Sequence, residues 1–164
     1  MRIDVSLRIT DNLQARALAA APALIEQELR KTMTGNVLLL ENDITQRVTV
    51  GATANLRGAT MTSVTGTGMD VTGRVWNPTL YGPPVESGGR AHWAPLASIE
   101  RWARRVIGGA NSGRVARAVW VAISKAGTKA KPFWAPAWKA QEPVIRQRHE
   151  AMVTRIARRL RGEA

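Results

Sequence analysis

The sequence predicts an α+β domain in which long N-terminal and C-terminal helices pack on a small, mainly antiparallel β-sheet. Two stretches, residues 23–46 and 137–162, place apolar residues at every third or fourth position, as a helix with one buried face does. Between them, residues 61–76 alternate in polarity around glycines, which is typical of a β-hairpin. Because 45% of the 164 residues are hydrophobic, enough for one core, we expect a single domain over residues 1–164, with residues 157–164 frayed.

The N-terminal part predicts a strand followed by a helix. Within residues 2–9, apolar and polar side chains alternate, which is the period of a half-buried strand. Thr10 and Asp11 can accept hydrogen bonds from the free N–H groups of a helix start, and the run NLQARALAAA favours helix. Pro22 then either kinks this helix or opens a new one at its first turn, because proline has no N–H to donate.

A long helix is expected over residues 23–46. Gly35 interrupts its pattern only weakly. We expect Glu26 and Glu28 on the solvent side of this helix. The buried stripe is predicted to consist of Ile25, Leu29, Met33, Val37, Leu40 and Ile44.

A hairpin and a loop are expected next. The alternation in residues 61–66 and 71–76 predicts two antiparallel strands around the turn-forming Gly66-Thr67-Gly68. Residues 77–95 are crowded with proline and glycine, so they predict a loop with at most one short helical turn.

Three further helices complete the prediction. The first covers residues 96–107 and stops at Gly108-Gly109, the second covers residues 112–127 with Ser112 as its cap and Gly127 at its end, and the third covers residues 137–162. The buried faces are predicted to be Leu96, Ile99, Ala103 and Val106 in the first, Val115, Val119, Ala122 and Ile123 in the second, and Ile145, His149, Met152, Ile156 and Leu160 in the third.

Nothing in the sequence predicts an enzyme, a cofactor or a metal. The chain has no cysteine, its two histidines have no metal-ligand spacing, and its carboxylates form no D-x-D or E-x-x-E cluster. The glycine-bearing stretches lack the GK[ST] of a phosphate-binding loop. Because His149 lies on an apolar stripe, we expect its side chain to be packed. We expect His92 to lie in a surface loop. Neither a signal peptide nor a membrane-spanning run is expected.

The charge and the tryptophans leave several kinds of partner open. A formal net charge of +12 predicts attraction to polyanions or to an acidic protein surface. Six tryptophans occur, and each can be core, subunit contact or a platform for stacking on bases. Arginines on the helices can be a solvated face or a binding face. We expect a basic face from Arg101, Arg104, Arg105, Arg148, Arg155 and Arg159.

Three segments, in order, resemble a known family. They are TANLRGA at 53–59, LYGPPVESG at 80–88 and AISKAGTKAKPFWAPAW at 122–138. Together they resemble the neck or tail-completion proteins of siphophages, also called head-tail joining or minor tail proteins, over about residues 20–155. Ala54 stands where that family usually has glycine, and Pro83-Pro84 stand between the tyrosine and the valine of the second motif.

The resemblance implies a structural virion protein and not an enzyme. It implies a ring of identical chains, hexameric in the family, that helps to join the tail to the head around the DNA channel, with head-closure or connector, tail terminator or tail tube proteins as partners. It also implies non-specific contact with genomic DNA, no membrane, synthesis in the cytoplasm of a host bacterium, and a place at the neck of the virion. The residues carried over as structural or interface positions are Asn55, Leu56, Arg57, Tyr81, Val85, Glu86, Gly88, Gly127, Thr128, Lys131, Pro132, Phe133 and Trp134.

Alternative interpretations remain beside this one. The basic charge also fits a stand-alone nucleic-acid-binding module, and a tail terminator is the second alternative. An enzyme of unknown type is weaker, since no convergent catalytic set is visible. For Glu86, an ion pair with an arginine of the same or an adjacent subunit and a plain surface position are both open.

Overall fold

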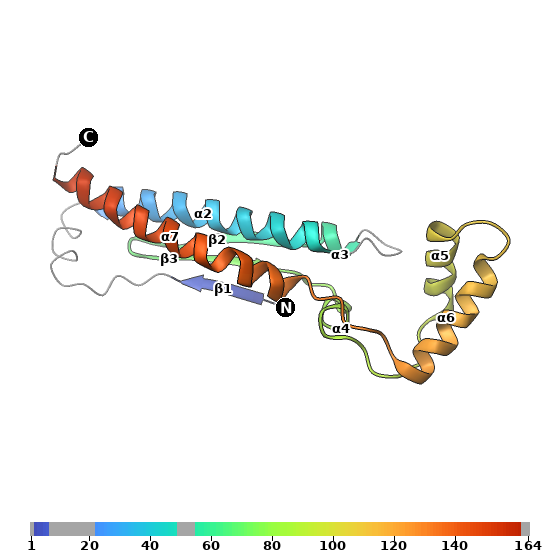
Figure 1. Cartoon of the computed structure of the whole chain (residues 1–164). Coiled ribbons are helices and arrows are strands. Elements are labelled where there is room, and N and C mark those ends of the chain that lie inside the picture. Colours follow the sequence, from blue (N-terminus) through green and yellow to red (C-terminus); the bar gives the residue numbers. More distant parts are fainter. Residues whose placement is uncertain (1, 7–21, 49–54, 162–164) are drawn as a thin grey trace. The chain divides into compact units, whose positions relative to one another are not determined.

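The computed structural model describes residues 2–6, 22–48 and 55–161 and confirms the mixed helix and sheet class. Its elements are β1 (Arg2–Ser6), α2 (Pro22–Arg47), α3 (Asn55–Gly58), β2 (Met61–Thr67), β3 (Asp70–Trp76), α4 (Gly82–Ser87), α5 (Leu96–Val106), α6 (Ser112–Ala126) and α7 (Trp134–Leu160), shown in Figure 1. The helix predicted after Thr10 and Asp11 lies outside the described residues.

The chain divides into two compact units. Of the described residues, the helix-sheet unit comprises 2–6, 22–44, 61–76 and 135–161, and the junction unit comprises 45–48, 55–60 and 77–134. The prediction of one domain over the whole chain stays a prediction.

In the helix-sheet unit, α2 and α7 lie side by side and run in opposite directions along a three-stranded antiparallel sheet (Figure 1). The strand order is β1-β3-β2, with Val75 opposite Ile3 on one side and Thr62 on the other. The predicted alternation is correct, because Val71, Gly73 and Val75 are buried while their neighbours along β3 are not. The turn falls slightly later than predicted, at Gly68-Met69, and Gly66 belongs to β2.

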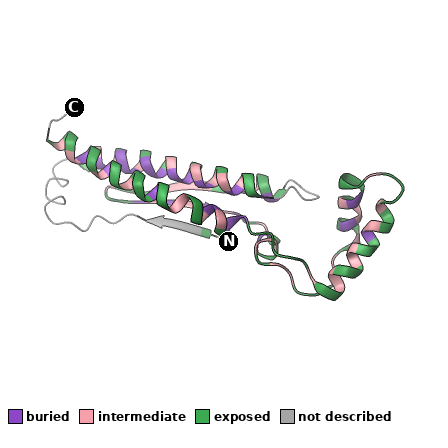
Figure 2. Cartoon of the chain, viewed as in Figure 1, coloured by how far each residue is buried: buried purple, intermediate pink, exposed green. Residues whose placement is uncertain are grey.

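The stripe predicted for the long helix is buried throughout α2. The structure describes α2 from Pro22 onwards, and the choice between the two alternatives for Pro22 rests on residues outside the described ranges. Three stripe residues, Ile25, Leu29 and Met33, form a core with Val71 of β3 and with Met152 and Ile156 of α7. Figure 2 shows that buried and exposed residues alternate along both α2 and α7. Helical periodicity thus located the core of this unit correctly.

One prediction on α2 is wrong. Glu28, expected in solvent, is only 2% exposed. Its two carboxylate oxygens contact Arg155 Nε at 3.3 Å and Arg159 Nη1 at 3.0 Å, both from α7. A buried carboxylate is destabilising unless opposite charges compensate it. Arg155 and Arg159 of α7 provide this compensation for Glu28. Glu26 is half-buried and accepts hydrogen bonds from the Gly68 N–H and from Arg30, which lower its pKa in that order.

A polar pair also links α2 to α7. Asn36, 1% exposed, places its Nδ2 atom 2.9 Å from Nε2 of His149. His149 is therefore a packed, half-buried residue, as predicted. Burial lowers the pKa of its imidazole from the ordinary value of 6.5, because a charged ring is poorly solvated there.

The lowered pKa of His149 predicts acid sensitivity. Below the unfolded-state pKa of about 6.5, the unfolded chain binds a proton that the folded chain resists. The stability from this site is therefore complete above about pH 6.5 and is lost as the pH falls towards the lowered folded pKa, by at most about 1.4 kcal/mol per pH unit. Urea unfolding at several pH values between about 5.5 and 7.5 measures it. In His149→Gln this part of the pH dependence should vanish, and an unchanged slope in that variant would contradict the assignment.

In the junction unit, α5 and α6 form a helical hairpin. Ile99, Ala103 and Ala116 are its buried core, and Gly108 follows α5 with a φ of +69°. Two predicted face residues are wrong, since Val106 and Ala122 are exposed. The buried contact consists of Ile99 and two small residues, Ala103 and Ala116, and the larger Val106 lies outside it. Ser112 does not cap α6, and its hydroxyl instead donates to Gly109 O.

Candidate functional site

The three segments singled out in the sequence meet within the junction unit. We call residues 55–58, 80–89 and 127–134 the signature junction. They comprise α3, the turn and short helix α4 with its flanks, and the link between α6 and α7. The helix α4 is slightly longer than the single turn expected for this loop. Hydrogen bonds between backbone groups and side chains hold these segments together.

Glu86 joins the second segment to the third. Its Oε2 atom accepts hydrogen bonds from the backbone N–H groups of Phe133 at 2.7 Å and Trp134 at 2.8 Å. These amides lie where α7 begins, and the first N–H groups of a helix have no partner within it. A carboxylate there satisfies two donors and offsets the positive end of the helix dipole. Glu86 thus acts as the cap of α7, a role that neither sequence interpretation foresaw.

A backbone ladder runs beside this cap. Gly89 and Thr128 form an isolated antiparallel bridge, with N···O distances of 3.1 and 2.9 Å, and Thr128 Oγ1 also accepts from Gly89 N. One turn away, Lys131 N donates to Val85 O at 2.8 Å. These bonds fix the α6–α7 link against α4 independently of side-chain charge.

Gly127 is required by this close approach. Its φ is +72° and its ψ is −154°, a region that side-chain-bearing residues avoid. A Cβ placed there would lie 2.0 Å from Gly89 O. The prediction that Gly127 ends its helix is confirmed. Glycine is required there because Gly89, which forms the bridge with Thr128, lies too close for a side chain.

The first segment is connected through Asn77. The buried Asn77 Nδ2 donates to Leu56 O at 2.7 Å and to Thr60 Oγ1 at 3.2 Å, while its Oδ1 accepts from the N–H and hydroxyl of Thr79. Leu56 is buried, and its Cδ1 atom would be 3.6 Å from a Cβ on Gly82. The first segment therefore packs against the start of the second.

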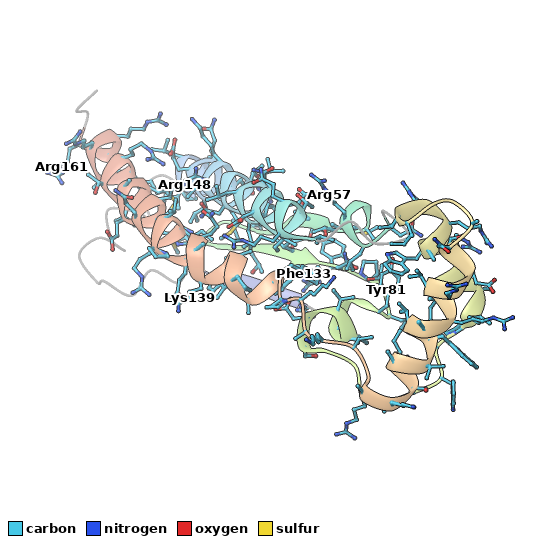
Figure 3. The ribbon with its side chains drawn as sticks, turned by 45° about the vertical axis from the view of Figure 1, so that its right-hand side comes forward. Arg57, Tyr81, Phe133, Lys139, Arg148 and Arg161 are labelled. Atoms are coloured by element: carbon cyan, nitrogen blue, oxygen red, sulfur yellow. The ribbon has the colours of Figure 1, made fainter. Side chains whose placement is uncertain are left out.

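The structure places the carried-over residues in three ways. Phe133 and Trp134 are each 1% exposed, in an edge-to-face pair at 6.2 Å, and Phe133 precedes the first turn of α7 (Figure 3). Leu56 is the third buried member. Half-buried members are Val85, Glu86, Gly88 and Gly127, and exposed members are Asn55, Arg57, Tyr81, Thr128, Lys131 and Pro132.

The six arginines of the expected basic face are all exposed, but they belong to different units. Arg101, Arg104 and Arg105 lie on α5 of the junction unit. Arg148, Arg155 and Arg159 lie on α7 of the helix-sheet unit. Three of the six arginines thus belong to each unit, and Arg155 and Arg159 have Glu28 as a partner.

Large apolar side chains are exposed in the junction unit. Leu80 is 94% exposed and Trp93 is 65% exposed, with the Trp93 ring 4.3 Å from that of Trp120. Trp120 Nε1 donates to Ala94 O, which holds this ring pair beside α6. Val106 and Ile107 at the end of α5 are also half exposed. Apolar surface left in water is typical of a contact region for another protein.

Neither a metal-holding cluster of side chains nor a membrane-spanning helix is present in the part of the chain that the structure describes. No group of three or more His, Asp or Glu residues there could hold a metal ion. Across residues 22–48 and 55–161, no helix is both long enough and apolar enough for a bilayer crossing. His92 is exposed in its loop, as predicted, with Nδ1 2.8 Å from Arg90 O.

Sequence reasoning missed two residues that hold the signature junction together. Asn77 precedes Pro78, a combination that favours a side-chain-stabilised turn, and that signal could have identified it. Gly89 follows the second segment directly, but its bridge to Thr128 spans 39 residues and has no local signature.

The cap predicts a measurable loss of stability. Glu86→Gln keeps an accepting oxygen but removes the charge, and should lower the free energy of unfolding by about 1 kcal/mol. Glu86→Ala leaves both amides without their acceptor and should cost about 2–3 kcal/mol. Chemical denaturation measures both.

The control is Glu142→Gln on α7. Glu142 pairs with Arg146 at 3.2 Å in an exposed i,i+4 contact, so its loss should cost less than about 0.5 kcal/mol. Equal effects at both positions would show that Glu86 contributes only surface charge.

No protein-family model, no curated protein and no solved structure matches the chain.

Proposed function

We propose that the chain is a structural protein of a tailed-phage virion, a ring-forming neck or tail-completion component that helps to join the tail to the head around the DNA channel. The supporting observation is the signature junction. Segments far apart in the sequence, which resemble the family motifs in order, gather into one hydrogen-bonded assembly through Glu86, Asn77 and the bridge from Gly89 to Thr128. Two of these are motif residues, Glu86 and Thr128, and their side chains hold backbone segments together, which suits an architectural role.

The exposed apolar residues support assembly with other chains. Leu80, Trp93 and Ile107 remain in water in the single chain, and contact with a neighbour would bury them. In a ring each subunit repeats the same contact, so individually modest interfaces add up. Head-closure or connector, tail terminator and tail tube proteins are the partners that this proposal implies, and the role is binding, not turnover.

The proposal is tested in the phage that encodes the chain. A nonsense mutation in its gene should give filled heads and separate tails that fail to join, and plasmid-borne wild-type protein should restore joined particles. Antibody labelling in electron micrographs should mark the head-tail junction. Normal joined particles without the protein would contradict the proposal.

Assembly has its own readout. Mass photometry of the purified chain, alone and with candidate neck partners, should detect a species near six times the 17.9 kDa subunit mass. Trp93→Ser combined with Leu80→Ser should weaken that species while leaving the folded monomer intact. If the double variant assembles at the same concentration as the wild type, Trp93 and Leu80 are not part of the interface.

A further inference from the structure

A basic groove lies between α2 and α7 in the helix-sheet unit. It has a volume of about 230 Å³ and is lined by Lys31, Thr32, Gly35, Arg148, Ala151 and Arg155. The hollow exists because the small residues Gly35 and Ala151 contribute to its lining from opposite helices. A Cβ added to Gly35 would lie 3.6 Å from Arg148 Nη1. Figure 3 shows Arg148 on α7 beside α2.

The groove carries an excess of positive charge. Arg148 donates to the neutral carbonyl of Gly35 at 3.0 Å, which leaves its charge uncompensated. Lys31 forms no ion pair with any residue in the described ranges. Arg155 pairs with Oε2 of Glu28, and the other carboxylate oxygen of Glu28 pairs with Arg159. Lys31 and Arg148 thus line the groove without a carboxylate partner among the described residues, and Arg155 is the lining cation that pairs with one.

The donors in the groove suit phosphate oxygens. Arginine presents a planar fork of N–H groups, and lysine a mobile ammonium. Both Lys31 and the guanidinium of Arg148 are exposed and able to reach a ligand without moving the helices. Arg155 also donates to Thr32 Oγ1, so that its side chain is held over the groove.

The openness of the groove favours a polyanion over a single ion. An exposed cation binds a free ion weakly in water, whereas a polymer releases counterions at every contact. Arg148, Arg155 and Arg159 succeed one another over about 16 Å of α7. Over that length one DNA strand presents about five phosphates.

We propose that this groove binds the phosphate backbone of double-stranded DNA, without reading its sequence. Lys31, Arg148 and Arg155 contact phosphate oxygens, and Arg159 extends the contact along α7. The site goes beyond the proposed function, because it is built within the helix-sheet unit and uses no residue of the signature junction. It can therefore be tested on the purified full-length chain, whatever happens in virion assembly.

The test is fluorescence anisotropy with a labelled DNA duplex across a salt series. The wild type should bind unrelated duplexes equally, with log affinity falling linearly against log salt. Lys31→Gln with Arg148→Gln removes two contacts and should make that slope shallower by about 1.8. Ala151→Glu retains every cation but adds a carboxylate at the groove, and should weaken binding too.

The matched control is Arg101→Gln with Arg104→Gln on α5, which removes the same charge from exposed positions in the junction unit. Its salt slope should equal that of the wild type, and thermal melting checks that every variant is folded. An equal change of slope in both double variants would overturn the groove as the site, as would a wild type that binds no duplex at low salt.

Two competitors separate DNA from other anions. Inorganic phosphate, added at constant ionic strength, should leave the duplex bound, and displacement by it would reassign the groove to small anions. Polyglutamate at equal charge should compete less well than unlabelled duplex. Equal competition would overturn the assignment to DNA in favour of an acidic protein surface.

Discussion

Replacing Gly127 by alanine is expected to destabilise the junction unit by about 3 kcal/mol or more. The alanine must adopt a φ of +72° with a ψ of −154°, and its Cβ would lie 2.0 Å from Gly89 O. The bridge between Gly89 and Thr128 therefore has to open, and the contact of the α6–α7 link with α4 weakens with it. Chemical denaturation gives the loss of stability, and amide exchange of Thr128 reports the bridge.

Gly108→Ala is the matched control for Gly127→Ala. Gly108 has a similar φ of +69°, but a Cβ there meets nothing within 4 Å. It should therefore cost only the conformational penalty, about 1 kcal/mol. If both variants lose the same stability, strain alone explains the effect and the close approach to Gly89 has no further cost.

Removing both arginines that face Glu28 should be similarly disruptive. In Arg155→Gln with Arg159→Gln, the carboxylate of Glu28, which is 2% exposed, loses both cationic contacts at 3.3 and 3.0 Å. An uncompensated buried charge costs about 3 kcal/mol or more. Urea denaturation of the double variant should show this loss as a lower midpoint.

Adding Glu28→Gln to the double variant tests the cause. Because the buried charge is then gone, most of the lost stability should return. Arg146→Gln with Arg158→Gln removes equal charge from exposed positions on the same helix and should change stability by less than about 1 kcal/mol. A triple variant no more stable than the double variant would show that packing of the arginine stems, not charge, stabilises this contact.

The helix-sheet unit could be predicted from the sequence because its order is periodic. The stripe from Ile25 to Ile44 and the alternation from Val71 to Val75 reflect one repeated geometry, so each residue supports the interpretation of the next. The C-terminal stripe was predicted for the same reason, and Ile145, Met152 and Ile156 are buried.

Periodicity failed where contact depends on the partner. On α5 and α6 the apolar faces were roughly located. The residues that are buried between the helices include the small Ala103 and Ala116, whereas Val106, predicted on the buried face, is exposed. Glu28 looked like a solvent residue because its arginine partners lie more than 120 positions away. The cap by Glu86 depends on a contact across 47 residues. Such polar contacts have no local pattern to find.

Gly73 restricts how α2 can move along the sheet. A Cβ at this position would lie 2.6 Å from Met33 Sδ and 2.7 Å from Val37 Cγ1, so both side chains occupy the notch between Val71 and Val75. On an even surface a helix can slip by one turn, about 5.4 Å. Here a slip would drive Met33 against the isopropyl group of a neighbouring valine. One hydrogen atom in place of a methyl group thus sets the lengthwise position of α2, and with it the alignment of Asn36 with His149.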